Sequence, residues 1–322
     1  MSARRKRLPS PVPMPAIILG SGIWHVLAKE GGFDLGSGRA VDTPFGPSRP
    51  IFEAALPGGR RALLLARHGE KGYETGAWSV NYRANLWALK ARGADAVLAT
   101  SACGGIDPLL SVGTFVLPDD IIDRTTNRAK TFFEGTGLGI LRHAEPFCPA
   151  LRGALAGALE SAGVRHRVGG VYVCMDGPRL ETPAEIRLFA SQGASLVGMT
   201  LAPEFALARE LELCYAPLAW VVNPAEGVAE RPYRPDVLFE GMATAEELAE
   251  GDRAAARLPA ILAEAIGRIA SDRPCHCRRA MQRYKDRGDI GGDFRTWVSA
   301  AARPRQGGFT AEDAENAEKG NG

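Results

Sequence analysis

Cysteine and long apolar runs are scarce in this 322-residue sequence, and each shortage excludes a class of protein. Six cysteines are too few for a disulfide-built scaffold of this length, which favours a reducing compartment and hence a cytoplasmic location. No stretch approaches the roughly 18 uninterrupted apolar residues of a membrane-spanning helix. We therefore expect no role within a membrane.

An excess of either charge is also missing. The 39 Lys and Arg residues nearly cancel the 37 Asp and Glu residues, which leaves a net charge of +2. Such a balance does not produce the electrostatic field that attracts nucleic acid or anionic lipid, so neither is expected as a partner. The basic run at residues 4–7 is followed by a proline-rich stretch, not by the apolar region of a signal peptide. Residues 1–14 are expected to form a flexible tail.

A metal-binding pattern is not evident either. Cys275 and Cys277 flank His276 in a C-x-C arrangement. Zinc sites usually use C-x-x-C spacing together with a second pair of ligands, and the sequence shows no second pair. We therefore expect no metal ion.

The apolar residues that are present follow an alternating pattern. Short β-branched or leucine-rich runs predict strands, and longer segments with a 3.6-residue period predict helices, which together indicate an α/β domain. Because no linker interrupts the pattern, residues 15–270 are expected to form one domain, and residues 271–322 a C-terminal extension that is partly disordered, chiefly over 306–322. Strands are predicted at 16–19, 62–67, 96–100, 114–117, 170–175, 196–199 and 215–222, and helices at 81–92, 149–162, 183–192, 203–211 and 243–269.

Small or anion-binding residues follow three of the predicted strands. Ser21 lies between two glycines after the first strand, Arg67 and His68 end the second, and Ser101 and Ala102 end the third. In an open α/β sheet, ligands bind beyond the carboxyl ends of the strands. Backbone N–H groups, hydroxyls and a guanidinium at that edge suit an oxyanion. Each signal alone is also typical of a tight turn or a surface pair, but the three together predict a phosphate site.

Longer motifs carry a resemblance to a known family. Over roughly residues 15–270 the chain resembles the purine nucleoside phosphorylase superfamily, in particular its methylthioadenosine phosphorylase branch, and within that branch the S-methyl-5′-thioinosine phosphorylases. The resemblance implies a single-domain α/β fold with a central mixed β-sheet flanked by helices. The motifs are Asp-Thr-Pro-Phe-Gly at 42–46, Leu-Ala-Arg-His-Gly at 65–69, the runs 81–90 and 177–185, Gly-Met-Thr at 198–200 and Val-Val-Asn-Pro at 221–224.

The resemblance also implies an activity and a set of site residues. The activity is phosphorolysis in purine salvage, in which phosphate attacks the anomeric carbon of a purine nucleoside and releases the base. No cofactor is implied, because phosphate is a co-substrate, and a homotrimer is expected. The implied phosphate-binding residues are Ser21, Arg67, His68, Ser101, Ala102 and Thr200; Met199 and Glu181 would bind the nucleoside, and Asn223 would be catalytic.

Asn223 is the residue that indicates which purine base the substrate carries. Adenosine-type relatives carry Asp at this position and a second Asp where Ala225 stands. An amide donates to a purine O6 and accepts from a protonated N7, and Glu181 can accept from N1–H of the same base. The sequence therefore favours a 6-oxopurine nucleoside: S-methyl-5′-thioinosine, inosine or guanosine. The choice between a 5′-methylthio group and a 5′-hydroxyl stays open.

Three alternatives remain. The protein could be an S-methyl-5′-thioadenosine phosphorylase of methionine salvage, a hydrolase-like nucleosidase, or a non-catalytic nucleoside-binding protein that kept the fold. Taken singly, Asn223 could be a turn residue, Glu181 a helix N-terminal carboxylate, and Met199 a core residue. Phosphate-dependent release of free base distinguishes phosphorolysis from the last two functions.

Overall fold

The structure is a computed structural model that describes residues 14–30, 33–238 and 241–298. The expected flexible tail at 1–14 and the expected disordered end at 306–322 lie outside these ranges, except for Met14. Within the described ranges, no helix is both long and apolar enough to cross a membrane.

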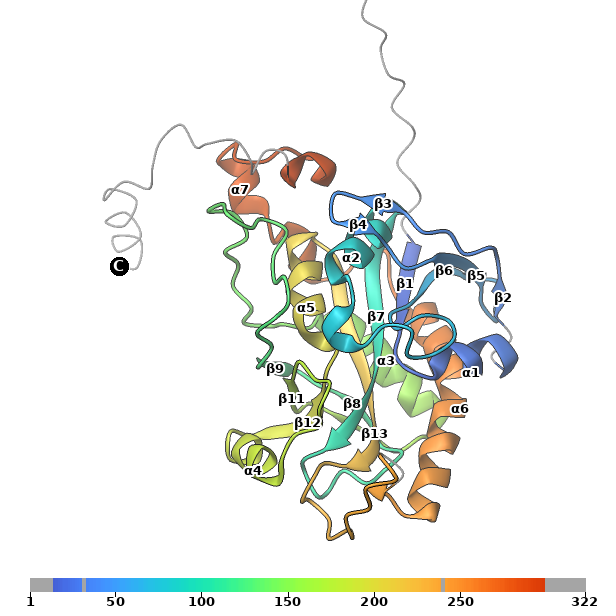
Figure 1. Cartoon of the computed structure of the whole chain (residues 1–322). Coiled ribbons are helices and arrows are strands. Elements are labelled where there is room, and N and C mark those ends of the chain that lie inside the picture. Colours follow the sequence, from blue (N-terminus) through green and yellow to red (C-terminus); the bar gives the residue numbers. More distant parts are fainter. Residues whose placement is uncertain (1–13, 31–32, 239–240, 299–322) are drawn as a thin grey trace, which may run out of the picture.

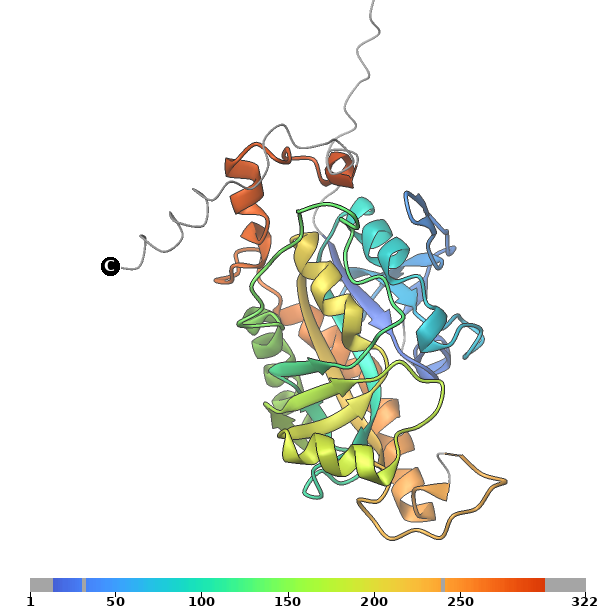
Figure 2. The same ribbon diagram turned by 60° about the vertical axis from the view of Figure 1, so that its left-hand side comes forward.

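The described residues form a mixed sheet of 11 strands and a separate two-stranded sheet, with helices against both faces of the large sheet (Figure 1). The main order is β10-β8-β13-β7-β1-β6-β5-β2, and β9, β11 and β12 branch from it where β12 pairs with β7. Figure 2 shows this branch, with α4 packed against it. The α/β class and the central mixed sheet flanked by helices are therefore confirmed.

The strands and helices have the following bounds. The strands are β1 (Met14–Leu19), β2 (Asp34–Leu35), β3 (Asp42–Thr43), β4 (Gly46–Pro47), β5 (Ile51–Ala55), β6 (Arg61–Ala66), β7 (Ala94–Gly105), β8 (Phe115–Leu117), β9 (Asp120–Asp123), β10 (His166–Val168), β11 (Val171–Cys174), β12 (Ala194–Gly198) and β13 (Cys214–Pro224). The helices are α1 (Ile23–Glu30), α2 (Tyr82–Ala91), α3 (Pro149–Ala162), α4 (Pro183–Ser191), α5 (Leu201–Glu210), α6 (Ala245–Arg268) and α7 (Gln282–Asp286).

Every predicted strand and helix overlaps an observed element. The elements that the sequence did not predict are mostly short. β9 has an aspartate at each end and four residues in all, and its pairing with β11 supplies the hydrogen bonds that its own sequence does not favour. The small edge strand β2 depends in the same way on its antiparallel partner β5.

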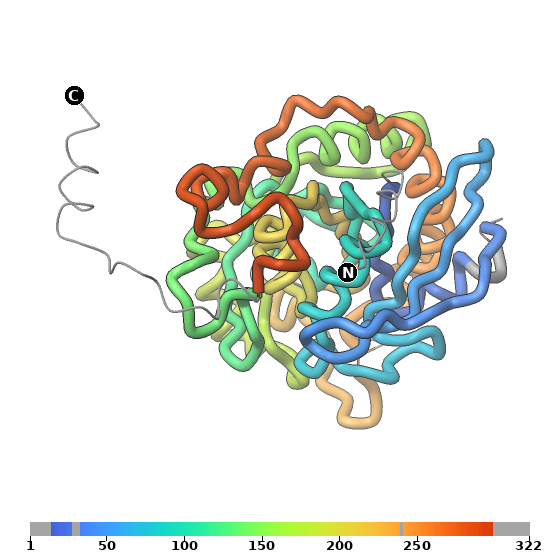
Figure 3. Tube along the Cα trace, turned by 90° about the horizontal axis from the view of Figure 1, so that it is seen from above, coloured from blue at the N-terminus to red at the C-terminus, as the bar shows by residue number. Residues whose placement is uncertain are grey.

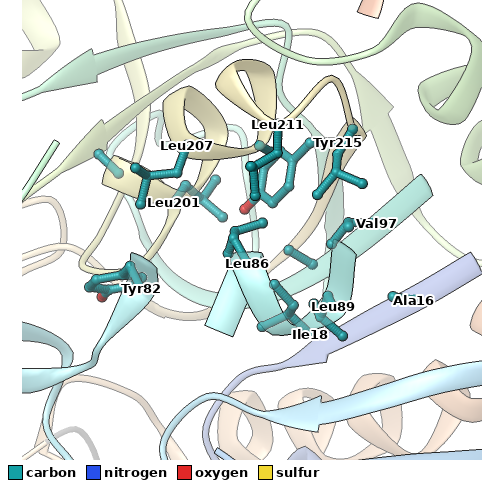
Figure 4. Packing of buried hydrophobic residues seen from close by; sticks show 14 of the residues in the cluster. Ala16, Ile18, Tyr82, Leu86, Leu89, Val97, Leu201, Leu207, Leu211 and Tyr215 are labelled. Atoms are coloured by element: carbon teal, nitrogen blue, oxygen red, sulfur yellow. The ribbon is translucent and has the colours of Figure 1, made fainter. Parts of the chain in front are cut away.

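The core has two halves because the central strands are buried on both faces. Ile18 of β1 packs in one apolar cluster and its neighbour Ile17 packs in the other, and the residues of β6 and β7 alternate likewise. Leu86 and Leu207 bring α2 and α5 to the first cluster (Figure 4), whereas α1, α3 and α6 cover the second. Each fully buried leucine stabilises the fold by about 1.5–3 kcal/mol relative to exposure.

Residues after α6 return to the body of the protein. This segment passes beside α3 and reaches α7, as Figure 3 shows from above. Met281, Tyr284 and Trp297 are buried in the same apolar cluster as α2 and α5. The domain boundary near residue 270 stays a prediction, and the segment beyond it contributes side chains to the core.

Candidate active site

Four parallel strands bring predicted site residues to one edge of the sheet. β1 lies between β6 and β7 and is parallel to both, and β13 is parallel to β7. The carboxyl ends of these strands therefore point the same way. This edge carries the segments that follow β1 and β6, the later part of β7 from Ser101 to Gly105, and Asn223 near the end of β13.

Two hydroxyls predicted to hold phosphate lie against each other. Ser101 Oγ and Thr200 Oγ1 are 3.1 Å apart, and Ser101 Oγ lies 3.0 Å from Tyr172 Oη. Thr200 is the N-cap residue of α5, but its side chain makes no capping hydrogen bond. Its hydroxyl is instead turned toward Ser101. Hydroxyls both donate and accept, so this buried group can reorient its protons toward an oxyanion.

Arg67 lies fully buried directly after β6, where it pairs with Glu204 of α5. Its Nε donates to Glu204 Oε1 at 2.5 Å and its Nη2 donates to Oε2 at 2.8 Å, while Tyr215 Oη donates to Oε2 at 2.8 Å. Arg67 Nη1 also donates to the carbonyl of Thr100 at 3.2 Å. Glu204 thus occupies the Nε–Nη2 edge of the guanidinium. An anion can bind only the remaining N–H groups of Nη1 and Nη2.

His68 is buried beside Arg67 and has a defined tautomer. Its Nδ1 lies 2.9 Å from the carbonyl oxygen of Thr75, which can only accept, so Nδ1 carries the proton. Burial, and then the charge of Arg67, lower the pKa of His68 to about 4. The ring is therefore neutral near pH 7, and Nε2 is left as a hydrogen-bond acceptor.

The turn after β1 approaches the same region through its backbone. Gly20 N–H donates to Thr100 Oγ1 at 2.7 Å, and a Cβ at Gly20 would lie 3.0 Å from the Thr100 carbonyl oxygen. Glycine thus permits the close approach that brings partly exposed Ser21 to this edge. Ala102 follows Ser101 in β7, pairs in register with Trp220 of β13, and is partly buried.

Met199 lies at the end of β12 against the loop that follows β11. A Cβ at Gly177, which has φ +72°, would lie 2.6 Å from Met199 Sδ. Arg128 holds this arrangement, since its Nη1 donates to the Met199 carbonyl at 2.7 Å and its Nη2 donates to the Asp176 carbonyl at 2.9 Å. The thioether is partly exposed at the edge that carries Thr200.

Glu181 is a buried carboxylate with an unused acceptor. It precedes Thr182, which caps α4 through a reciprocal pair of hydrogen bonds with Glu185, so the cap fixes the backbone next to Glu181. The side chain is 8% exposed, and no described residue donates to its Oε1. Burial raises its pKa. A buried acceptor without a protein donor is costly, and a donor group of a ligand or of a water molecule can satisfy it.

Asn223 is buried in β13, next to Gly104 of β7. Its Nδ2 donates to the Pro224 carbonyl at 2.6 Å. The following segment lies against the start of α4, because a Cβ at Gly227 would lie 2.9 Å from Pro183 Cβ. The segment that follows Asn223 therefore lies beside Pro183, two residues after Glu181.

The structure thus brings some predicted residues into direct contact and leaves others apart. Ser101 contacts Thr200, and Arg67 and His68 adjoin each other beside Thr100. Among the described residues, no hydrogen bond joins Glu181 or Asn223 to that group. The roles assigned to these side chains stay predictions.

Sequence reasoning missed several polar partners, chiefly Glu204, Tyr215, Tyr172 and Arg128. One signal could have pointed to Glu204: it is a single carboxylate in the otherwise apolar segment 201–208. A buried charge in such a place requires a cationic partner. No local pattern marks Tyr172 or Arg128, whose partners lie up to 74 positions away along the chain.

Comparisons with known proteins identify relatives of this chain. The chain is 36% identical over 278 residues to the 6-oxopurine nucleoside phosphorylase of Pyrococcus furiosus, a match that covers 84% of this chain and 98% of the relative. It is 44% identical over 215 residues to a probable S-methyl-5′-thioinosine phosphorylase of Pseudomonas syringae pv. tomato, a match that covers 66% of this chain and 85% of the relative. Among solved structures, a methylthioadenosine phosphorylase from an antarctic soil metagenomic library matches with a TM-score of 0.74 and 28% identity over 91% of this chain and 99% of that chain.

A family model also matches most of the sequence. The model described as the phosphorylase superfamily matches residues 16–267, which include every residue assigned to the candidate site. The chain belongs to the phosphorylase superfamily.

Proposed function

We propose that the protein catalyses the phosphorolysis of a 6-oxopurine nucleoside in purine salvage. Phosphate attacks C1′, the bond from C1′ to the purine N9 breaks, and the products are the free base and a ribose 1-phosphate or its 5-methylthio analogue. The named activities of the relatives support this class of reaction. The observation that carries the choice of base is the buried, unpartnered Oε1 of Glu181.

The phosphate side of the proposed site uses Ser21, Ser101, Thr200, the Ala102 backbone and the free N–H groups of Arg67. His68 contributes an acceptor, Nε2, which suits the proton of a monohydrogen phosphate. The transition state of glycosidic cleavage has oxocarbenium character, so an anion fixed beneath the sugar stabilises the developing positive charge. Positioning and electrostatics are sufficient, and no protein nucleophile is required.

The base side uses Glu181 and Asn223. The N1–H group of a 6-oxopurine can donate a hydrogen bond to Glu181 Oε1. Adenine has an unprotonated N1 at that position, which can only accept. As the C1′–N9 bond breaks, its electron pair flows into the base and N7 takes up a proton from the solvent. The Asn223 carbonyl accepts from that N7–H while its amide donates to O6. Met199 is proposed to pack against the ribose.

S-methyl-5′-thioadenosine is the second candidate substrate. The named activity of the solved relative favours it. Asn223 argues against it, because an amide does not offer the carboxyl group that pairs with the exocyclic amine and N7 of adenine. Ala225, which is buried, provides only a methyl group where a second carboxylate would lie.

The assembly, location and cofactor requirement are part of the same proposal. The exposed aromatic rings of Tyr73 and Trp78 lie next to His68 and Gly177, and a neighbouring subunit in a homotrimer would cover such surfaces. The free thiols of all six cysteines fit the cytoplasm. The proposed reaction needs no cofactor, because phosphate is the co-substrate.

One assay tests the proposal. Inosine, guanosine, S-methyl-5′-thioinosine and S-methyl-5′-thioadenosine are each supplied with and without phosphate, and the free base is measured. We expect release that requires phosphate and is fastest with a 6-oxopurine. Release without phosphate would show hydrolysis, and binding without release would show a non-catalytic protein. The Glu181→Gln variant should lose turnover of 6-oxopurine nucleosides by about 10²-fold, because its amide can no longer act as a charged acceptor.

A further inference from the structure

Four cysteine sulfurs meet at one point of the structure. The Sγ atoms of Cys148, Cys214, Cys275 and Cys277 all lie within 4.8 Å of one another, and those of Cys214 and Cys275 are 3.5 Å apart. All four are free thiols, three of them buried and Cys275 partly exposed. Cys214 begins β13, and Ser101 of the candidate phosphate site pairs in register with Ala219 of the same strand, so the cluster lies about 17 Å along the strand from that site.

The four sulfurs come from three separate parts of the chain. Cys148 is the N-cap residue of α3, Cys214 is the first residue of β13, and Cys275 and Cys277 follow α6. The hydrogen bond from Cys148 N–H to the Tyr215 carbonyl at 2.7 Å holds the first two segments together. The second pair of ligands that the sequence did not reveal is thus supplied by two cysteines that look isolated along the chain.

The spacing of the sulfurs matches a tetrahedral metal site. A Zn²⁺ ion binds thiolate sulfur at about 2.3 Å, so the sulfurs of a regular tetrahedron are about 3.8 Å apart. The observed 3.5 Å separation and the 4.8 Å upper limit bracket this value. Small side-chain rotations would therefore bring all four sulfurs into the coordination shell of one ion.

The charges around the cluster fit the same site. Zn²⁺ with four thiolates carries a net charge of −2. Arg209 Nη1 lies 3.7 Å from Cys277 Sγ, and the Arg273 guanidinium lies within hydrogen-bonding reach of the Cys214 thiol. Asp95 pairs with both Arg273 and Arg278. Three guanidinium groups and one carboxylate leave a local charge of +2.

We propose that these four cysteines form a structural site for a thiophilic divalent cation, with Zn²⁺ as the best fit. Four thiols bind the ion and release their protons to the solvent, and no electron is transferred. Closed four-cysteine coordination leaves no open position, so the site is structural and not catalytic. Two disulfides would be uncharged and would leave Arg209 facing neutral sulfur.

The site has a specific structural consequence. Cys275 and Cys277 belong to the segment that carries α7 and the buried Trp297 to the core. A metal ion bound by these two cysteines together with Cys148 and Cys214 would link this segment to α3 and β13. Loss of the ion should therefore loosen the C-terminal segment and lower the melting temperature of the whole chain.

Metal content and spectroscopy of the full-length protein test the proposal. Protein purified under reducing conditions should hold about one Zn²⁺ per chain after gel filtration. After chelation, added Co²⁺ should produce the thiolate charge-transfer bands of a tetrahedral site, and Zn²⁺ should displace it. Cys275→Ser and Cys277→Ser should lose most of the metal and the Co²⁺ spectrum. Cys174→Ser, which changes a buried cysteine outside the cluster, should keep both.

Three results would overturn the proposal. The first is wild-type protein that holds no metal and gives no Co²⁺ spectrum although all six thiols titrate. The second is an intact mass lowered by the hydrogens of one or two disulfides within the cluster. The third is a metal content that survives in both serine variants. Because wild-type protein alone gives the first two readouts, the test remains decisive if a serine variant fails to fold.

Discussion

Arg67 and Glu204 form a two-pronged ion pair in the interior, 137 positions apart in the chain, with side chains that are 0% and 1% exposed. The pair unites the end of β6 with α5, and it places a guanidinium beside the carbonyl of Thr100 without leaving an uncompensated charge. A buried pair of this kind fixes geometry more than it adds stability. The terminal N–H groups of Arg67 are thus oriented before any anion arrives.

Glu204→Gln should be strongly destabilising. The substitution leaves the Arg67 charge buried beside a neutral amide, which typically costs about 3–5 kcal/mol. Urea unfolding measures the loss. The control is Glu264→Gln, which breaks the exposed pair with Arg268 and should cost less than about 0.5 kcal/mol. Equal losses of unfolding free energy in the two variants would show that burial does not make the Arg67–Glu204 pair more costly to break.

A combined variant separates the structural role of the pair from its catalytic role. Arg67→Met, Glu204→Leu and Tyr215→Phe together remove the charges and the hydroxyl that bonds to them. Stability should return to within about 1–2 kcal/mol of wild type, because apolar replacements avoid the desolvation cost. Phosphorolysis should still fall by at least about 10²-fold. Full activity in this variant would show that Arg67 does not bind phosphate.

The hydroxyl pair of Ser101 and Thr200 leads to a second prediction. Ser101→Ala and Thr200→Ala should each raise the KM for phosphate by about 5–10-fold, since each loses one hydrogen bond to the anion worth about 1 kcal/mol. The KM for phosphate of the double variant should rise by less than the product of the two single increases, because the two hydroxyls are in contact. Initial rates at varied phosphate concentration measure both effects.

Ser111 and Thr114 provide a matched control for that experiment. Their hydroxyls are 3.4 Å apart in the turn before β8, outside the candidate site. Ser111→Ala should leave the KM for phosphate unchanged. If Ser101→Ala also leaves it unchanged, the assignment of the hydroxyl pair to phosphate is wrong.

The edge of the sheet was predictable from sequence, whereas its internal contacts were not. Ser101 and Arg67 follow runs of buried residues with clear strand character, so their common edge follows from parallel pairing alone. The partner of Arg67 is Glu204, and no local pattern specifies a contact across 137 positions. Glu181 could be placed before a helix, but its unpartnered oxygen depends on how neighbouring loops pack.

The cysteine cluster shows the same limit. Cys148 and Cys214 occur singly in apolar surroundings, which is typical of inert core cysteines. Only the path of the chain after α6 brings Cys275 and Cys277 to them. That path is set by the burial of side chains such as Trp297 and Phe294, and the Phe294 ring centroid lies 4.9 Å from that of Trp87 in α2. Long-range packing of this kind carries no periodic signal in the sequence.

His68 leads to a prediction about stability at low pH. Its pKa is lowered to about 4 in the folded protein, whereas the ordinary value is 6.5. The unfolded chain therefore takes up a proton before the folded chain does, and the contribution to stability is full above pH 6.5 and is lost as the pH falls toward 4. The free energy of unfolding should drop by about 2 kcal/mol between pH 7 and pH 5 through this group.

Two variants isolate that contribution. His68→Asn should remove the drop, so that the difference in stability between wild type and variant shrinks as the pH falls. His25→Asn changes an exposed residue of α1 and should leave the pH profile as in wild type. Urea unfolding at several pH values gives the comparison. A wild-type profile that matches the His68→Asn profile would disprove the lowered pKa.

Asn223→Asp should shift the choice of base. A carboxyl group can pair with both N7 and the exocyclic amine of adenine, whereas the amide pairs with N7–H and O6 of a 6-oxopurine. We expect kcat/KM for S-methyl-5′-thioadenosine relative to S-methyl-5′-thioinosine to rise by about tenfold, which corresponds to about 1.4 kcal/mol. Asn223→Ala is the control, because it removes the amide and should lower both rates without reversing the preference. A wild-type enzyme that already prefers the adenine nucleoside would contradict the role of Asn223, since the amide would then not be selecting the base.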